Sequence, residues 1–434
     1  MTPIRISWLL RRSTDRRAAS LGSGAYALVT TLVALTMAGA HSFLRWDDDV
    51  GAGLQGLAAL ALVLLVVPLV YLGAAAARLS ARAQDRRLST LRLVGATGQQ
   101  VAGVTVLGAA AEAALGAVAG LVAGAALAPA VGLIHFRGEA IGTAIWMPWW
   151  LAALVMVAVV IVAAVSALVG MRRVLVTPLG VRTRAARPVP GWLRLVIAAG
   201  LVVLGMMVTS STSTLGQVVG VAGVVIAILG VFLGGFVALN AVGPWVLGVW
   251  ARRKLRSASN AASLLSARSV LDDAAATWRQ VSGAAMAGFV AVVGGAGAAL
   301  SKGLDSEPST DVVSGVDVRT GVIVTLVIAF VGVASTTLVS QAATVLDRED
   351  LDHSLWMMGV PPEIPGKARV QGLMGPLVLT LLVAVVASAT LLFPLVGMSL
   401  ITDPVTLLVV ALVCVLGVLT VRVAAVVAGR VATR

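Results

Sequence analysis

The chain has 434 residues, of which 59% are hydrophobic and only 12% are charged. A water-soluble domain carries about 25% charged residues, so this composition excludes an ordinary soluble enzyme and predicts an integral membrane protein. The apolar segments are rich in Ala, Val, Leu and Gly, which favours spanning helices over barrel strands. The predicted fold class is therefore all-α, a polytopic bundle of membrane helices.

The net charge of +13 does not indicate nucleic-acid binding, because the basic residues lie in blocks between apolar segments. The single cysteine, Cys414, lies within an apolar run, and the three histidines are scattered along the chain. Neither residue type has the spacing of metal ligands. We therefore expect no metal site and no catalytic residue in this chain.

Ten apolar segments are expected to span the membrane. In chain order they cover approximately residues 24–44, 52–77, 101–134, 149–171, 193–208, 218–246, 281–300, 321–345, 372–395 and 405–428. With both termini cytoplasmic, the outer side receives only four of the 32 basic residues, namely Arg45, Arg137, Lys302 and Arg319. Such an asymmetry is typical of a protein that obeys the positive-inside rule. The expected location is the cell membrane, with both termini cytoplasmic.

A basic segment, residues 78–100, lies between the second and third expected spans. Leu88, Leu91 and Val94 recur there at helical spacing, which predicts a short amphipathic helix. Thr97 is typical of a point where one helix ends and the next is capped. We interpret the segment as a coupling helix on which a partner protein acts; an ordinary basic loop is the alternative. The residues expected to contact the partner are Arg82, Arg86, Arg87, Leu88, Leu91, Arg92 and Gly95.

The segment has a counterpart later in the chain when Gly95 is placed on Gly359, an offset of 264 residues. This alignment predicts two four-helix units of the same orientation. The expected parts are residues 1–180 with a coupling helix at 78–97, a basic linker and two-helix insert at 181–255, and residues 256–434 with a coupling helix at 346–360. The second coupling helix is acidic rather than basic, and its expected contact residues are Leu351, Leu355, Met358 and Gly359.

The third expected span carries small residues and one acid at every fourth position, on one face of the helix. They are Gly108, Glu112, Gly116, Gly120 and Gly124. The glycines predict close packing against another helix. A carboxylate in lipid costs at least ~2.5 kcal/mol, so Glu112 is expected to face protein or water. It could be a conformational latch, a substrate contact or a satisfied hydrogen bond between helices.

Residues 86–97, RRLSTLRLVGAT, resemble the coupling segment of the FtsX-like, or MacB-like, permeases of ABC transporters. Glu112 with Gly116 and Gly120 also fits that family, as does TPLGVR at residues 177–182. The resemblance implies a permease that a separate ATPase moves by mechanotransmission, two ATPase subunits serving one chain. It implies export of a lipophilic or amphipathic substrate, such as a drug, an antimicrobial peptide or a lipid-anchored cargo.

The sequence contains no G-x-x-x-x-G-K-[ST] phosphate loop, so the chain itself is not expected to be an enzyme. No cofactor is expected in this chain; ATP and Mg would bind the partner ATPase. The other expected partners are the lipid bilayer and the hydrophobic substrate.

Two other functions stay open. One is a regulatory membrane protein that uses ATPase strokes to control a cell-envelope partner. The other is an ion-coupled secondary transporter. Short outer segments disfavour the first, and a single intramembrane carboxylate disfavours the second, because coupled transport needs several buried ionisable sites.

Overall fold

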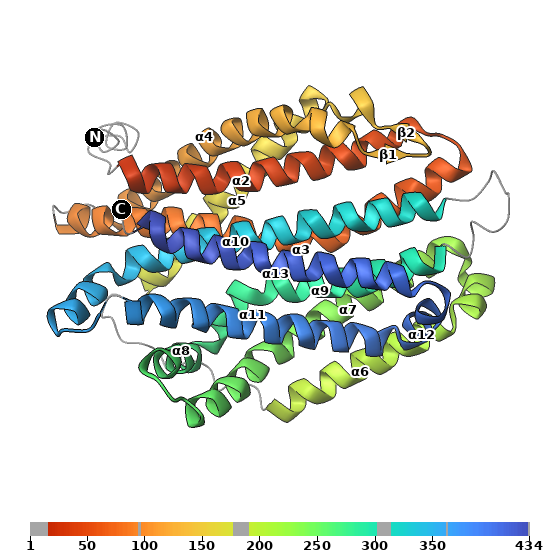
Figure 1. Cartoon of the computed structure of the whole chain (residues 1–434). Coiled ribbons are helices and arrows are strands. Elements are labelled where there is room, and N and C mark those ends of the chain that lie inside the picture. Colours follow the sequence, from red (N-terminus) through yellow and green to blue (C-terminus); the bar gives the residue numbers. More distant parts are fainter. Residues whose placement is uncertain (1–15, 94–96, 177–190, 302–313, 362, 433–434) are drawn as a thin grey trace.

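The computed structural model describes residues 16–93, 97–176, 191–301, 314–361 and 363–432, and these are nearly all helical (Figure 1). The first part contains α2 Arg16–Ser42, η1 Phe43–Arg45, α3 Asp49–Leu93, α4 Gly98–Gly132, β1 His135–Phe136, β2 Glu139–Ala140, η2 Gly142–Ile145 and α5 Trp149–Val176. The rest contains α6 Gly191–Ser210, α7 Thr212–Arg256, α8 Ala261–Asp272, α9 Ala274–Ser301, α10 Gly315–Met357, α11 Glu363–Leu391, α12 Phe393–Thr402 and α13 Pro404–Ala432. The predicted all-α bundle is confirmed.

Each of the ten expected spans falls on one long helix of the described chain, namely α2 to α7, α9 to α11 or α13. Seven stretches within the described residues are long and apolar enough to cross a membrane. The count of ten spans therefore stays a prediction. The sequence analysis did not predict the small antiparallel hairpin of β1 and β2, or the short helix α12.

Helices α3 and α10 are longer than a bilayer requires. They contain 45 and 43 residues, so each extends over about 65 Å, roughly twice the 30 Å hydrocarbon layer. The expected short helix at 78–97 is instead the continuation of α3 as far as Leu93. No Gly or Pro interrupts the chain between Gly73 and Leu93, and the Ala, Arg and Leu residues there favour helix.

One end of the bundle gathers the features expected on the cytoplasmic side. Figure 1 shows the start of α2, the end of α13 and the α3–α4 and α10–α11 junctions at its left end. The β1–β2 hairpin and α12 lie at its right end. We call these the inner end and the outer end.

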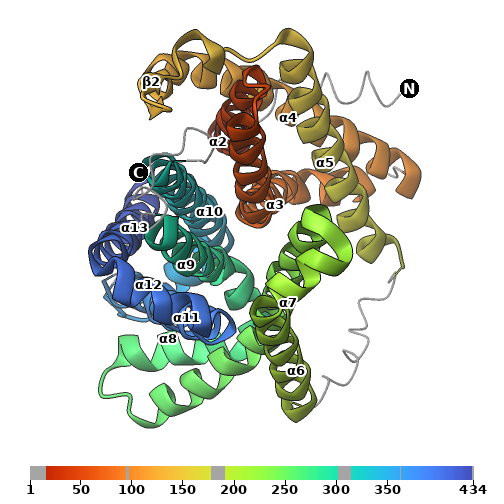
Figure 2. The same ribbon diagram turned by 90° about the vertical axis from the view of Figure 1, so that its right-hand side faces the viewer.

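Two main hydrophobic clusters form the core. One surrounds α9, in which every residue from Val281 to Ala291 is buried, and it extends over α10, α11 and α13. The other joins α2, α3, α4 and α5. The long helices connect the clusters, because Leu64 and Leu65 of α3 belong to the first and Val339 of α10 belongs to the second. The seam between α3 and α10 is therefore where the two halves of the bundle meet (Figure 2).

The two halves share two helix pairings and differ in another. Helix α2 packs along α4 and α3, and α9 packs along α11 and α10 in the equivalent way. Helix α5, however, packs mainly on α4, whereas α13 packs mainly on α10. Helices α6 and α7 pack on each other and lie beside both halves in the end view (Figure 2).

Candidate functional site

The first inner junction consists of the end of α3 and the start of α4. Helix α3 ends at Leu93, and Thr97 caps α4. The backbone N–H of Gln100 donates to Oγ1 of Thr97, and the N–H of Thr97 donates to Oε1 of Gln100, which completes a capping box. The predicted cap at Thr97 is therefore confirmed, whereas the predicted helix end near Gly95 falls on residues outside the described part of the structure. The side chains of Arg82, Arg86, Arg87, Leu88, Leu91 and Arg92, and the whole of Gly95, lie outside the described part of the structure.

The second inner junction lies where the alignment requires it. Helix α10 ends at Met357, which is 264 residues after Leu93, and Gly359 follows with φ +84°. Glycine adopts this left-handed conformation without strain, so it ends the helix here. The side chains of Leu351 and Leu355 are outside the described part.

This second junction exposes a cluster of large apolar side chains. Trp356, Met357 and Met358 are 62, 65 and 69% exposed at the end of a helix that extends past the hydrocarbon layer. Exposed apolar clusters mark surfaces that bind protein or membrane. The sequence analysis selected Met358 and missed the two residues before it, although consecutive Trp-Met-Met at a helix end was a visible signal.

Glu112 lies where α2, α3 and α4 meet, and it does not face open lipid. The hydroxyl of Ser80 on α3 donates a hydrogen bond to Oε2 of Glu112 on α4. Gly22 of α2 is close on the other side, because a Cβ added there would lie 2.9 Å from the same oxygen. The carboxylate therefore contacts three helices of the first half.

The glycine face of α4 packs on α2. A Cβ at Gly116 would lie 2.5 Å from the carbonyl oxygen of Ser23, and one at Gly120 would lie 2.5 Å from that of Ala27. The hydroxyl of Thr31 donates to the carbonyl oxygen of Gly120 at 3.1 Å, across the helix pair. Close packing is thus as predicted at these two glycines.

The seam loosens toward Gly124. A Cβ at Gly124 would meet Ala34 at an ordinary 3.5 Å, and Gly108 at the other end is half-buried. The packing at Gly116 and Gly120 is therefore tighter than at Gly124.

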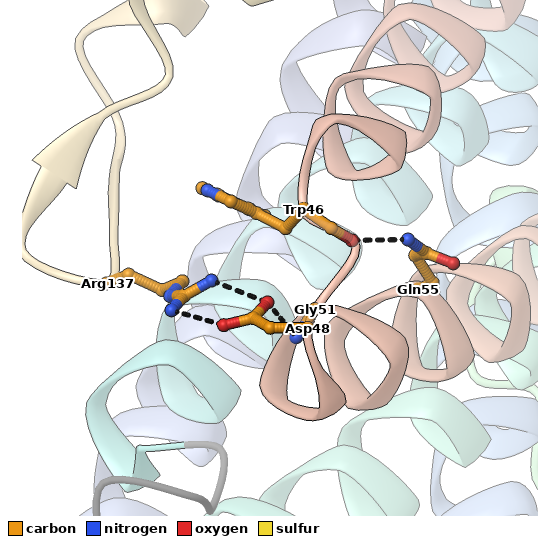
Figure 3. A network of polar contacts seen from close by, with 5 residues as sticks. All are labelled: Trp46, Asp48, Gly51, Gln55 and Arg137. Atoms are coloured by element: carbon orange, nitrogen blue, oxygen red, sulfur yellow. Dashed lines mark hydrogen bonds and ion pairs between the residues drawn. The ribbon is translucent and has the colours of Figure 1, made fainter.

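At the outer end, Asp48 and Arg137 form an ion pair (Figure 3). The two terminal nitrogens of the guanidinium donate to the two carboxylate oxygens at 2.9 and 2.7 Å, a bidentate arrangement. Asp48 also accepts a hydrogen bond from the N–H of Gly51 at 3.0 Å, and so it caps the start of α3.

The hairpin presents Arg137 to α10 as well. Arg137 and Gly138 form the two-residue turn between β1 and β2, with φ of +56° and +76°, the conformation of a type I′ hairpin. The backbone N–H of Arg137 donates to Oδ1 of Asp317 at 2.9 Å. Asp317 lies in the first turn of α10 and is only 5% exposed, although the expected span begins only at residue 321. We call Asp48, Arg137 and Asp317 the outer clamp.

Among known proteins, the family model described as FtsX-like permease C-terminal matches residues 58–179. Residues 58–179 are therefore similar to an FtsX-like permease domain, and we call them the FtsX-like domain. They extend from the third turn of α3 through α4 and the hairpin to the end of α5. No curated protein and no solved structure matches the chain.

The FtsX-like domain contains most of the geometry described above. Ser80, Glu112, the glycine seam of α4 and Arg137 lie inside it, whereas Gly22, Asp48 and Asp317 are contributed from outside. Among the described residues, no group of three or more His, Cys, Asp or Glu side chains is arranged to hold a metal ion. The family suggests a non-catalytic membrane subunit of an ABC transporter and a multi-pass position in the membrane.

Proposed function

We propose that this chain is the permease of an ATP-driven transporter and that a separate ATPase moves it through the α3–α4 and α10–α11 junctions. The observation that carries the proposal is the continuity of α3, which runs unbroken from the outer clamp to the first junction. Although Pro68 removes one backbone hydrogen bond from α3, the helix continues through it as a single rod, and we expect a displacement at the inner end to reach the membrane core. Helix α10 has the same form and packs directly on α3.

The two rods support a division of the chain into two units. The junctions are 264 residues apart, and each half contains the same pairing of its first and third helices, α2 with α4 and α9 with α11. We propose residues 1–180 and 256–434 as these units, with residues 181–255 between them. One chain would then bind two ATPase subunits, one at each junction, with ATP and Mg held by the ATPase.

The direction of transport and the substrate follow from the same proposal. The described outer segments are short, ending in a two-residue hairpin turn rather than in a folded outer domain. A MacB-like role in driving an outer-membrane channel uses a large outer domain, so we favour extrusion of a lipophilic or amphipathic substrate from the bilayer by mechanotransmission. The bundle's surface is apolar over the spanning helices, which suits a substrate that arrives through lipid.

The test is isolation of a tagged chain from its native membrane. We expect an ABC ATPase to co-purify at two copies per chain, and its ATP hydrolysis to depend on the chain. A regulatory protein would also bring a cell-envelope partner, which a transporter does not require. A chain that transports substrate with no ATPase present would overturn the proposal.

A further inference from the structure

The last turn of α7 and the helix α8 form a strongly basic corner at the inner end. Arg252, Arg253 and Arg256 are exposed on α7, and Arg268 is exposed on α8. Helices α7 and α8 pack on each other, so these side chains belong to one surface.

Helix α8 crosses the bundle instead of running along it. It is seen nearly end-on in Figure 1 and lengthwise in Figure 2, whereas the spanning helices show the reverse. Its inward residues Ser266, Ala267 and Val270 are buried, while Leu264 and Leu265 on the other side are exposed. A helix that lies across a membrane bundle with exposed leucines beside arginines is typical of the membrane interface.

Aromatic residues at the end of α7 indicate where the bilayer surface lies. Trp245 lies about two turns before the basic run and Trp250 lies just before it, as tryptophans do at the boundary of the hydrocarbon layer. The Nζ of Lys254 is 4.8 Å from the ring centroid of Trp250, so the ammonium group lies at the same depth as that ring. The arginines beyond it therefore lie at the depth of lipid headgroups.

The local balance of charge is positive. Among the described side chains of α7 and α8, the acids are Asp272 and Asp273, at the far end of α8. The carboxylate of Asp273 already accepts a hydrogen bond from the N–H of Ala276 at 2.7 Å, at the start of α9. Four exposed arginines thus face the headgroup region with little acidic compensation, and arginine binds phosphate in a bidentate manner.

We propose that this corner is a binding site for the phosphate group of an anionic phospholipid, with Arg253 and Arg256 as its main ligands and Leu264 and Leu265 inserted beside the acyl chains. Basic residues next to a spanning helix attract anionic lipid by about 1 kcal/mol each. A bound lipid holds α8 against α7 and α11, and so stabilises the connection into the second half of the chain.

The test measures the midpoint of thermal unfolding by tryptophan fluorescence, for the purified full chain in neutral detergent. Phosphatidylglycerol should raise the midpoint by several degrees more than phosphatidylcholine. Arg253→Gln with Arg256→Gln should remove at least half of that difference. Arg253→Lys with Arg256→Lys should remove less of it, because the charges remain although the bidentate geometry is lost. Leu264→Ser with Leu265→Ser should also reduce it.

A matched control removes two positive charges at the opposite end, by Arg45→Gln with Arg319→Gln, and should keep the full difference. Equal effects of the two lipids, or an equal loss in the control, would overturn the proposal. A rise of the same size with inorganic phosphate alone would also overturn it, because the site would then bind free phosphate.

Discussion

The backbone N–H of Arg137 donates a hydrogen bond of 2.9 Å to Oδ1 of Asp317, which lies 180 residues further along the chain. The bond fastens the hairpin of the FtsX-like domain to the first turn of α10. Since the guanidinium of the same arginine pairs with Asp48 at the start of α3, one residue ties the outer ends of both long helices together. A push on the inner ends of α3 and α10 must therefore act against the outer clamp.

Removing the carboxylate of Asp317 should loosen this connection. Asp317→Ala leaves the N–H of Arg137 without its acceptor, and an unsatisfied donor of this kind costs about 1–3 kcal/mol. We expect a lower midpoint of thermal unfolding and faster hydrogen exchange at the amide of Arg137. Asp47→Asn, an exposed acid beside the clamp, is the control and should change neither quantity. Unchanged exchange in Asp317→Ala would show that the bond does not hold the hairpin.

The ion pair of the clamp should be stable to mild acid. The hydrogen bonds from Arg137 hold the pKa of Asp48 below its ordinary value of 3.8, with smaller contributions from the N–H of Gly51. Because the folded pKa lies below the unfolded one, the contribution of the pair is fully present above pH 3.8 and is lost as the pH falls through the lower folded value. A pH titration followed by carbon-13 NMR of the carboxylate should give Asp48 a pKa below 3.8. In Arg137→Gln we expect its pKa to rise toward 3.8; a pKa that does not move would contradict the assignment.

Because α2 and α4 pack tightly, one added methyl group between them should lower the free energy of unfolding. In Gly120→Ala the new Cβ would lie 2.5 Å from the carbonyl oxygen of Ala27, so the helices must separate and the hydrogen bond from Thr31 is weakened. We expect a loss of about 1–3 kcal/mol in the free energy of unfolding. Gly124→Ala is the matched control on the same face, because its Cβ meets Ala34 at 3.5 Å. Equal stability of the two variants would contradict the packing described here.

Several of these features could be predicted from local sequence and others could not. The cap at Thr97 and the close packing at Gly116 depend on residues within a few turns of each other, and spacing alone indicated them. The outer clamp depends on a contact between Arg137 and Asp317 that no local pattern encodes. Asp317 lies before the expected span at 321–345, and its burial comes only from tertiary packing.

The two inner junctions should differ in how they bind the ATPase. The first is basic along residues 78–92, whereas the second is acidic and ends in the exposed residues Trp356, Met357 and Met358. We expect Arg82→Glu with Arg86→Glu to weaken ATPase binding about tenfold, the equivalent of ~1.4 kcal/mol. Asp350→Lys with Asp352→Lys should weaken ATPase binding much less. Trp356→Ala should weaken it more than this pair of substitutions does. The difference between the junctions is measured as the stimulation of ATP hydrolysis at several concentrations of the ATPase. Equal losses from both charge pairs would contradict the asymmetry.

Substitutions of Glu112 separate a structural role, in joining α2, α3 and α4, from a role of its charge in transport. Its carboxylate accepts a hydrogen bond from Ser80 and lies against Gly22, so Glu112→Ala leaves that hydroxyl without this acceptor and should cost about 1–3 kcal/mol in unfolding free energy. Glu112→Gln keeps an acceptor oxygen and the side-chain volume, and we expect it to lose less than ~1 kcal/mol. A double-mutant cycle of Glu112→Ala with Ser80→Ala, which removes both partners of the hydrogen bond, should give a coupling of ~0.6 kcal/mol, as is typical of hydrogen bonds between membrane helices. Because Glu112→Gln folds, its transport rate reports on the charge alone. A reduced rate assigns the negative charge a role in the transport cycle, and an unchanged rate assigns Glu112 to the joining of α2, α3 and α4.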